Sequence, residues 1–227
     1  MTTILAFFTY LFGCMLLSAA LLPWLAGPFE AWFGATPDRA LYRFAMLLAL
    51  IGMPLLLTLQ HLRGRENMGF PTLPGGWKRP IGMGLVYGTL ILAGLLLVLV
   101  TSGARVLTKE EFDWLVALRY LLAGLASGLL VGLIEEFFFR GPMHTGARRS
   151  LGFWPTALLT GAFYSMVHFV RPLPPSKEEL DIAETVSMML GGFQALTDPE
   201  IADRFVALMI AGMFLSMVRE RTGSILW

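Results

Sequence analysis

Charged residues are scarce in this 227-residue chain. Asp, Glu, Lys and Arg make up 15% of it, whereas 56% of its residues are hydrophobic. The first charged residue is Glu30, and the mean hydropathy of +0.68 is far above that of an ordinary soluble domain. A net charge of only +1 argues against a nucleic-acid partner. The composition therefore predicts an all-α fold, a polytopic transmembrane helix bundle with the lipid bilayer as its surroundings.

Cysteine is also scarce, and basic residues are missing from the start of the chain. The single cysteine, Cys14, excludes an intrachain disulfide. A cleaved signal peptide would carry basic residues before a shorter apolar core. The stretch Ile4–Ala26 is instead long enough to cross a bilayer, which takes about 20 residues. We expect a retained helix here, with a signal anchor as the alternative.

Six apolar stretches separated by charged connections are long enough to span a membrane. They are Ile4–Ala26, Tyr42–Gln60, Ile81–Thr101, Leu115–Phe139, Phe153–Val170 and Ile201–Val218. Another apolar run starts at Ile225 and reaches Trp227, where the chain stops. The sequence predicts one integral membrane domain over residues 1–227, with six spans and the start of a seventh.

Basic residues favour the connections on the N-terminal side, which predicts a cytoplasmic N-terminus, and we expect a bacterial inner membrane. On that side the sequence has Arg63, Arg65, Lys78, Arg79, Arg148, Arg149, Arg219 and Arg221. The opposite connections have Arg39, Arg105, Lys109, Arg171, Lys177 and Arg204.

The longest connection runs from Arg171 to Arg204 and is acidic. The spacing in Ser176–Glu179 is that of a capping box, which predicts the start of a short helix. Asp198 before Pro199 predicts an N-cap followed by proline in the first helical position. A solvated connector at the outer face is favoured over a functional lid.

A four-residue repeat marks one face of the fourth predicted helix. Gly124, Gly128 and Gly132 continue into Glu136 and Arg140 at the same spacing. The glycines predict close approach of another backbone, and Glu136 can pair with Arg140 one turn later. Glu135 lies about 100° away around the helix and can face a different cavity.

Ionisable groups at membrane depth are costly, so they persist where they pair, line a watery cavity or do chemistry. Glu135 and Glu136 could instead only mark a helix end that Gly141-Pro142 closes, with Arg140 favouring the C-terminal dipole. Two adjacent acids oppose that dipole, so the functional interpretation is preferred.

His168 is the one histidine inside a predicted span, and Tyr164 precedes it by one turn. A carboxylate kept from bulk water gains basicity and can take a proton from water that attacks an amide carbonyl. Glu135 and His168 together therefore suit peptide hydrolysis. The same two residues could hold a divalent metal such as zinc, but no third ligand is evident and no cofactor is required.

Other intramembrane chemistries lack their motifs. Neither His-Glu-x-x-His nor Gly-x-Gly-Asp occurs. Ser127 superficially suggests a rhomboid-type serine, but Leu125 stands where that motif needs glycine. We expect Ser127 to be a small packing residue.

The ordered motifs resemble the CAAX protease and bacteriocin-processing family of membrane proteases, which includes the type II prenyl endopeptidase. Its Glu-Glu-x-x-x-Arg is matched by Glu135, Glu136 and Arg140, and its Phe-x-x-x-His by Tyr164 and His168, with tyrosine replacing phenylalanine. A stretch like Arg219–Ser224 commonly precedes its third motif. The resemblance covers about residues 115–227.

The resemblance implies that Glu135 activates water, that His168 assists, and that Glu136 and Arg140 support them in a metal-free mechanism. The family's third motif, His-x-x-x-Asn, forms the oxyanion site in a helix beyond the Arg-Thr-Gly-Ser turn. No histidine follows His168. We expect a chain of this length to lack full activity and to be part of a longer one, with a degenerate relative of the family as the alternative.

Helix lengths pose a geometric problem. Counted along antiparallel helices, Glu135 falls near the cytoplasmic end and His168 toward the outer end. They can meet only if residues 141–151 dip and lower the start of the next helix.

The leading hypothesis is an intramembrane endopeptidase acting on a peptide or protein segment. The alternatives are a non-catalytic scaffold or immunity protein, and a small proton-coupled transporter using Glu135, Glu136 and His168.

Overall fold

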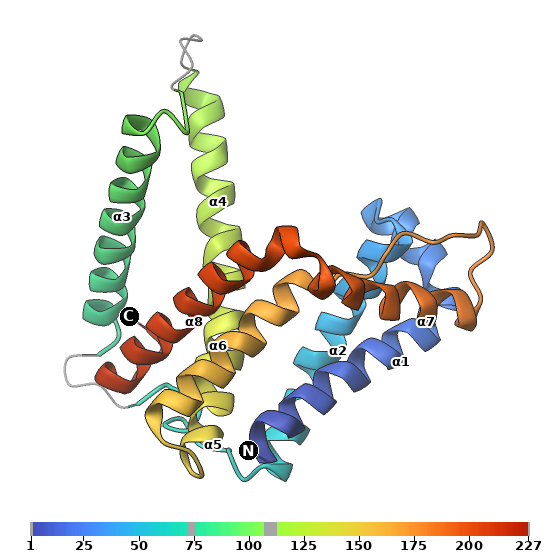
Figure 1. Cartoon of the computed structure of the whole chain (residues 1–227), viewed down its shortest axis with the longest axis horizontal. Coiled ribbons are helices and arrows are strands. Elements are labelled where there is room, and N and C mark those ends of the chain that lie inside the picture. The colour runs from blue at the N-terminus through green and yellow to red at the C-terminus, as the bar shows by residue number, and fades with distance from the viewer. Residues whose placement is uncertain (1, 72–75, 107–112, 227) are drawn as a thin grey trace.

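The computed structural model describes residues 2–71, 76–106 and 113–226, and over these ranges every regular element is helical. Figure 1 shows the arrangement. In chain order the elements are α1 (Thr2–Phe33), α2 (Pro37–Leu59), α3 (Lys78–Thr101), α4 (Trp114–Glu135), η1 (Glu136–Met143), α5 (His144–Arg148), α6 (Phe153–Phe169), α7 (Ile182–Gly191), η2 (Gly192–Thr197), η3 (Pro199–Ile201) and α8 (Ala202–Thr222). The predicted all-α class is confirmed.

Four helices are long and apolar enough to cross a bilayer: α1, α2, α3 and the combined η3–α8 segment. The predicted set of six clear spans is not confirmed. The fifth expected span corresponds to α6, whose 17 residues extend about 26 Å, just short of a hydrocarbon core about 30 Å thick. The chain is an integral membrane protein with several apolar helices.

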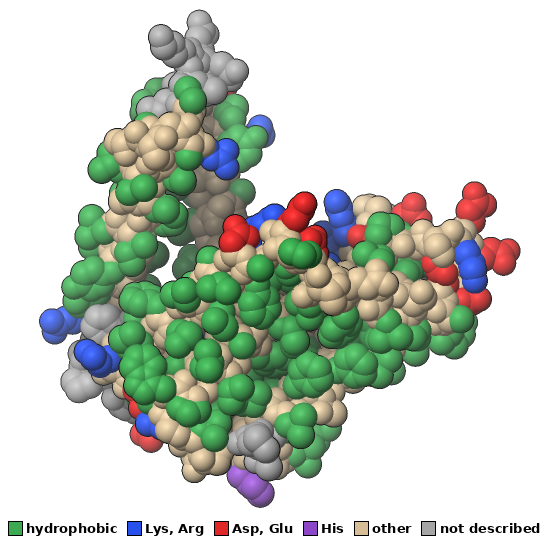
Figure 2. Space-filling view, in the orientation of Figure 1, with side chains coloured by type: hydrophobic (Ala, Val, Ile, Leu, Met, Phe, Trp, Pro, Cys, Tyr) green, Lys and Arg blue, Asp and Glu red, His purple; other side chains and the backbone are tan. Residues whose placement is uncertain are grey.

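The bundle is built on two helix pairs, α1 with α2 and α6 with α8, and α7 packs against α1. In Figure 1, α3 and α4 rise away from these pairs. Figure 2 shows apolar side chains over most of the visible face, while acidic and basic side chains gather toward its margins, notably around α7. This distribution suits a protein whose sides face lipid.

The expected close approach along the glycine face of α4 is wrong for the glycines at 128 and 132. A Cβ added at Gly128 or Gly132 would meet no described atom within 4 Å. The close contact lies instead where α6 crosses α8. There a Cβ at Gly212 would lie 3.0 Å from Gly161 Cα, and one at Gly161 would lie 2.8 Å from Met209 O. Small residues thus bring α6 and α8 together, as they do in other membrane helix pairs.

The end of the fourth helix also differs from the expectation. The regular α-helix ends at Glu135, whereas the sequence predicted an end at Gly141-Pro142. The chain then continues as the π-helical segment η1. Within η1, Gly141 has a non-helical ψ of −110°, so the path bends there before α5. The bend falls beside Pro142, which cannot donate the helical hydrogen bond.

The long connection contains one confirmed prediction and one wrong one. Asp198 caps η3 by accepting from the backbone N–H of Glu200, with Pro199 in the first position, as expected. The other helix does not begin near Ser176. It begins at Ile182 and is capped by Asp181, whose carboxylate accepts from the N–H of Glu184. Ser176 instead donates to the carboxylate of Glu184.

Candidate active site

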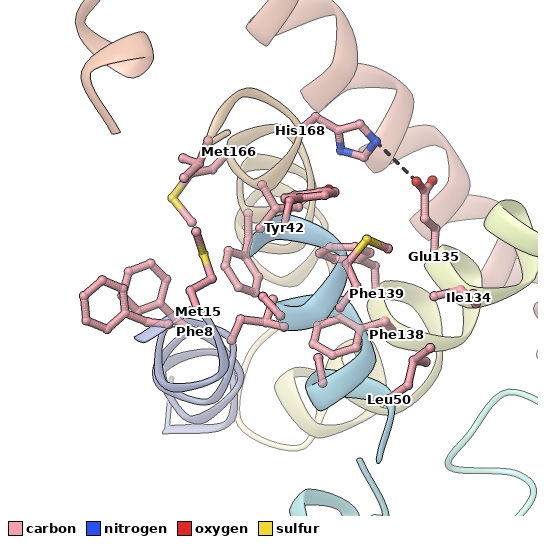
Figure 3. Close-up of a pocket in the computed structure, with 18 of the residues that line it drawn as sticks. Phe8, Met15, Tyr42, Leu50, Ile134, Glu135, Phe138, Phe139, Met166 and His168 are labelled. Atoms are coloured by element: carbon pink, nitrogen blue, oxygen red, sulfur yellow. Dashed lines mark ion pairs between the residues drawn. The ribbon is translucent and has the colours of Figure 1, made fainter. Parts of the chain in front are cut away.

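Glu135 and His168 are in contact. The Nε2 of His168 lies 3.4 Å from Oε1 of Glu135, and both side chains are about one-quarter to one-third exposed. Figure 3 shows the two facing one another across the mouth of a cavity. Tyr164 joins them, because its hydroxyl donates to Oε2 of Glu135 over 3.0 Å and its ring lies 4.4 Å from the imidazole, centroid to centroid. The structure therefore brings together three residues that the sequence singled out.

The backbone determines which tautomer His168 adopts. Its Nδ1 lies 2.8 Å from the carbonyl oxygen of Tyr164, one turn earlier in α6. A carbonyl oxygen can only accept, so Nδ1 carries a proton and Nε2 is directed at Glu135. Neither a bare Nε2 nor a carboxylate can donate, so their contact requires one proton between them. The pair is suited to passing that proton from one group to the other.

The path of the chain explains how Glu135 and His168 reach the same level. Helical structure continues past Glu135 through η1 and α5 to Arg148, and α6 then begins at Phe153. His168 lies near the end of α6, so the helical path from Glu135 to Arg148 and the stretch of α6 from Phe153 to His168 are of similar length. Glu135 is therefore not at the end of the helical path. The geometric problem disappears because the start of α6 is displaced away from Glu135.

A buried arginine lies beneath the site. The Arg140 side chain is 1% exposed, and its Nη1 lies 3.4 Å from Oε1 of Glu136. The guanidinium carbon lies 4.2 Å from the centroid of the Tyr164 ring, within the range of a cation–π contact. Glu136 and Glu135 therefore have different partners, as the sequence predicted. Arg140 supports the ring of the residue that donates to Glu135.

An apolar cavity of about 140 Å³ adjoins Glu135 and His168. Apart from these two residues its lining is almost entirely aromatic and aliphatic, and it comes mainly from α1, α2, α4, η1 and α6, with Val170 and Phe193 from the segments that follow. Figure 3 shows that the labelled lining includes Phe8, Met15, Tyr42, Leu50, Ile134, Phe138, Phe139 and Met166. Such a lining keeps bulk water away from the carboxylate and can receive an apolar side chain or segment.

The donor set does not resemble a conventional zinc site. Among the residues that the structure describes, no group of three or more His, Cys, Asp or Glu side chains is placed to hold a metal ion. Glu135 and His168 offer two ligands, whereas catalytic zinc sites in proteins use three.

Sequence reasoning missed two parts of this region. It placed the functional resemblance after residue 115, although α1 and α2 supply much of the cavity wall. The aromatic pair Phe8 and Phe12, one turn apart on α1, was the available signal. It also assigned no role to Arg219, whose side chain reaches the carbonyl of Arg140. Ser127 lies outside the residues whose side chains the structure describes.

Comparison with known proteins gave a family match for the half of the chain that contains this site. Residues 117–227 match the family model described as type II CAAX prenyl endopeptidase Rce1-like, a family of proteases. No curated protein gave a significant match, and no solved structure did. The matched segment contains Glu135, Glu136, Arg140, Tyr164 and His168. Over residues 117–227, this chain is thus similar to the type II CAAX prenyl endopeptidase Rce1-like family.

Proposed function

We propose that this protein is an intramembrane endopeptidase of the CAAX-processing type, which hydrolyses a peptide bond with water activated by Glu135. The observation that supports it most directly is the contact of Glu135 with His168 beside an apolar cavity, within a segment of a protease family. Its substrate is a peptide or protein segment that reaches the cavity from the membrane. The protein is multi-pass, with six spans and a cytoplasmic N-terminus.

Glu135 acts as the general base. Its carboxylate takes a proton from a water molecule as the water oxygen attacks the carbonyl carbon of the scissile amide. The proton that the resting pair shares is then on Nε2 of His168, whose Nδ1 proton is held by the Tyr164 carbonyl. His168 gives its Nε2 proton to the leaving amine as the C–N bond breaks, and the proton taken by Glu135 then passes to Nε2, which balances the reaction and restores the pair.

Glu136, Arg140 and Tyr164 have supporting roles. Tyr164 orients the Glu135 carboxylate through its hydroxyl. Arg140 and Glu136 neutralise one another and hold the Tyr164 ring from below. This mechanism needs no metal, because base, acid and orienting groups all come from the chain.

Peptide cleavage by the purified full-length protein tests this proposal. Glu135→Gln removes the base but keeps the shape, so kcat should fall by at least roughly a hundredfold, the usual contribution of general acid–base catalysis. The kcat of His168→Ala should fall similarly, and cleavage by the wild-type protein should persist in the presence of a chelator. Lys177→Gln, an exposed change in the α6–α7 connection, is the control and should behave as wild type.

Three results would count against it. Unchanged cleavage in Glu135→Gln would remove Glu135 as the base. Abolition of cleavage by chelator, with recovery on adding zinc, would replace the metal-free mechanism. Ion flux in vesicles that depends on Glu135, without any peptide cleavage, would favour a transporter.

A further inference from the structure

The last turn of α8 contacts the η1–α5 segment on both sides of its bend. The Nε of Arg219 donates to the carbonyl oxygen of Arg140 over 3.1 Å, immediately before Gly141. The next residue, Glu220, has its Oε2 3.2 Å from Nε2 of His144, just beyond the bend. Two adjacent side chains of α8 thus contact the bent segment before and after Gly141.

Arg219 also connects a third segment. Its Nη2 donates to the carbonyl oxygen of Glu66 over 3.1 Å, in the turn that follows α2. That turn presses on the bend, because a Cβ at Gly141 would lie 2.7 Å from the carbonyl oxygen of Met68. Backbone carbonyls freed by a bend need donors when they are removed from water. A guanidinium has donors in a rigid fork and can serve two carbonyls at once.

The contact beyond the bend is also well supported. Arg148 Nη2 lies 2.7 Å from Oε1 of Glu220, so the carboxylate is held from two directions. His144 is 3% exposed, and its Nε2 contacts the carboxylate of Glu220. The last turn of α8 therefore restrains α5 as well as η1.

The position of the bend matters for Glu135 and His168. Glu135 is at the end of α4 and continues directly into η1, whereas His168 is on α6, which packs against α8 at Gly161 and Gly212. Any rotation of η1 relative to α8 therefore moves Glu135 relative to His168. A misplacement of about 1 Å in a catalytic group can lower a rate by roughly a hundredfold.

We propose that Arg219 is a positioning residue, which acts through the backbone carbonyl of Arg140 to keep Glu135 in contact with His168. Its effect on catalysis rests on the proposed peptidase function, whereas its effect on geometry does not. Arg219 touches neither of the two groups that would react.

A cross-linking experiment tests the geometry without any activity. Glu135→Cys and His168→Cys are combined in a Cys14→Ala background, and a short bifunctional thiol reagent is applied to the protein in membranes. We expect efficient cross-linking with Arg219 present and at least a fivefold loss of rate in Arg219→Ala. Arg219→Lys, which keeps the charge but has one nitrogen in place of the guanidinium fork, should be intermediate. Arg221→Ala, at an exposed arginine one residue before the end of α8, is the matched control.

A kinetic experiment tests the link to catalysis in otherwise wild-type protein. Arg219→Ala should lower kcat by roughly ten- to a hundredfold while KM changes less than threefold, because the cavity is unaltered. The pH at which kcat is half-maximal should also shift, since the proton shared by Glu135 and His168 depends on their separation. A loss of folded protein alone would lower kcat without moving this pH.

Unchanged cross-linking in Arg219→Ala, or an equal loss in Arg221→Ala, would overturn the inference. If Arg219→Ala does not fold, the comparison of Arg219→Lys with Arg221→Ala decides the matter in the same way. If the wild-type protein cleaves no peptide, the proposed function fails while the cross-linking still decides the role of Arg219.

Discussion

At the scale of residues, Tyr164 combines two contacts that a substitution can separate. Its hydroxyl donates to Glu135, and its ring covers the Arg140 guanidinium. Only the hydroxyl is lost in Tyr164→Phe, and phenylalanine is the residue that the related proteases have there. A net hydrogen bond contributes about 1 kcal/mol, and 1.4 kcal/mol is tenfold in rate. We therefore expect kcat for peptide cleavage to fall no more than roughly tenfold.

Tyr164→Ala is the contrasting change, because it removes the ring as well. Tyr164 is 8% exposed and belongs to the same apolar cluster as Phe139 and Phe163. Truncating a buried aromatic residue costs about 3–5 kcal/mol. The melting temperature in detergent should fall clearly in Tyr164→Ala and little in Tyr164→Phe. Equal melting temperatures for the two variants would show that the ring does not support Arg140.

Residue types and spacing were enough to predict the partners within the site. Glu136 and Arg140 are four residues apart on one helix, so their pairing follows from local geometry. The contact of Glu135 with His168 needed the three-dimensional path as well, because helix lengths alone placed them at different levels. Arg219 could not be assigned from sequence, since it donates to main-chain carbonyls and any residue provides one.

At the scale of elements, α7 is fastened to the preceding connection by a carboxylate. Glu184 is buried and accepts from the backbone N–H and the hydroxyl of Ser176, which lowers the pKa of its carboxyl group. A group whose pKa is lowered on folding stabilises the protein above its ordinary pKa. That stability is lost as the pH falls through the lowered, folded-state value. The attachment of α7 should therefore weaken only in acid.

Glu184→Gln tests this attachment, because the amide has the shape of the carboxylate but carries no charge at pH 7. Limited proteolysis of the connection before α7 should be faster in Glu184→Gln than in wild type at pH 7. The difference should shrink as the pH falls below the ordinary range for a glutamate. Glu178→Gln, an exposed change in the same connection, is the control. A difference that persists undiminished in acid would mean that the charge of Glu184 is not responsible.

Helices were predictable as elements, but some of their boundaries were not. Long apolar stretches identified α1, α2, α3 and α8, because such stretches must form helices inside a bilayer. The change from α-helix to π-helix at Glu136 has no signature in the local sequence that distinguishes it from an ordinary helix end. The start of α7 was predicted too early, because Ser176 does not cap a helix that begins beside it. Its hydroxyl donates instead to the carboxylate of Glu184, within α7.

At the scale of the whole molecule, the segments rich in arginine meet at one end. The N-terminus, the turn after α2 and α5 lie near one another in Figure 1. Direct contacts join them: α1 packs on α5, Arg149 donates to the carbonyl of His61, and the N–H of Ile225 donates to the carbonyl of Gly69. The acidic α7 region lies far from this end. The connections thus sort into two sides, as a multi-pass protein requires.

This sorting makes the orientation testable, because basic connections remain in the cytoplasm. In a Cys14→Ala background, Arg63→Cys places one thiol in the turn after α2, and Lys177→Cys places one before α7. Both original residues are exposed. A membrane-impermeant maleimide should label position 177 in intact cells and position 63 only in inside-out vesicles. The reverse pattern would invert the protein, and labelling of both positions from one side would require an even number of crossings between α2 and α7.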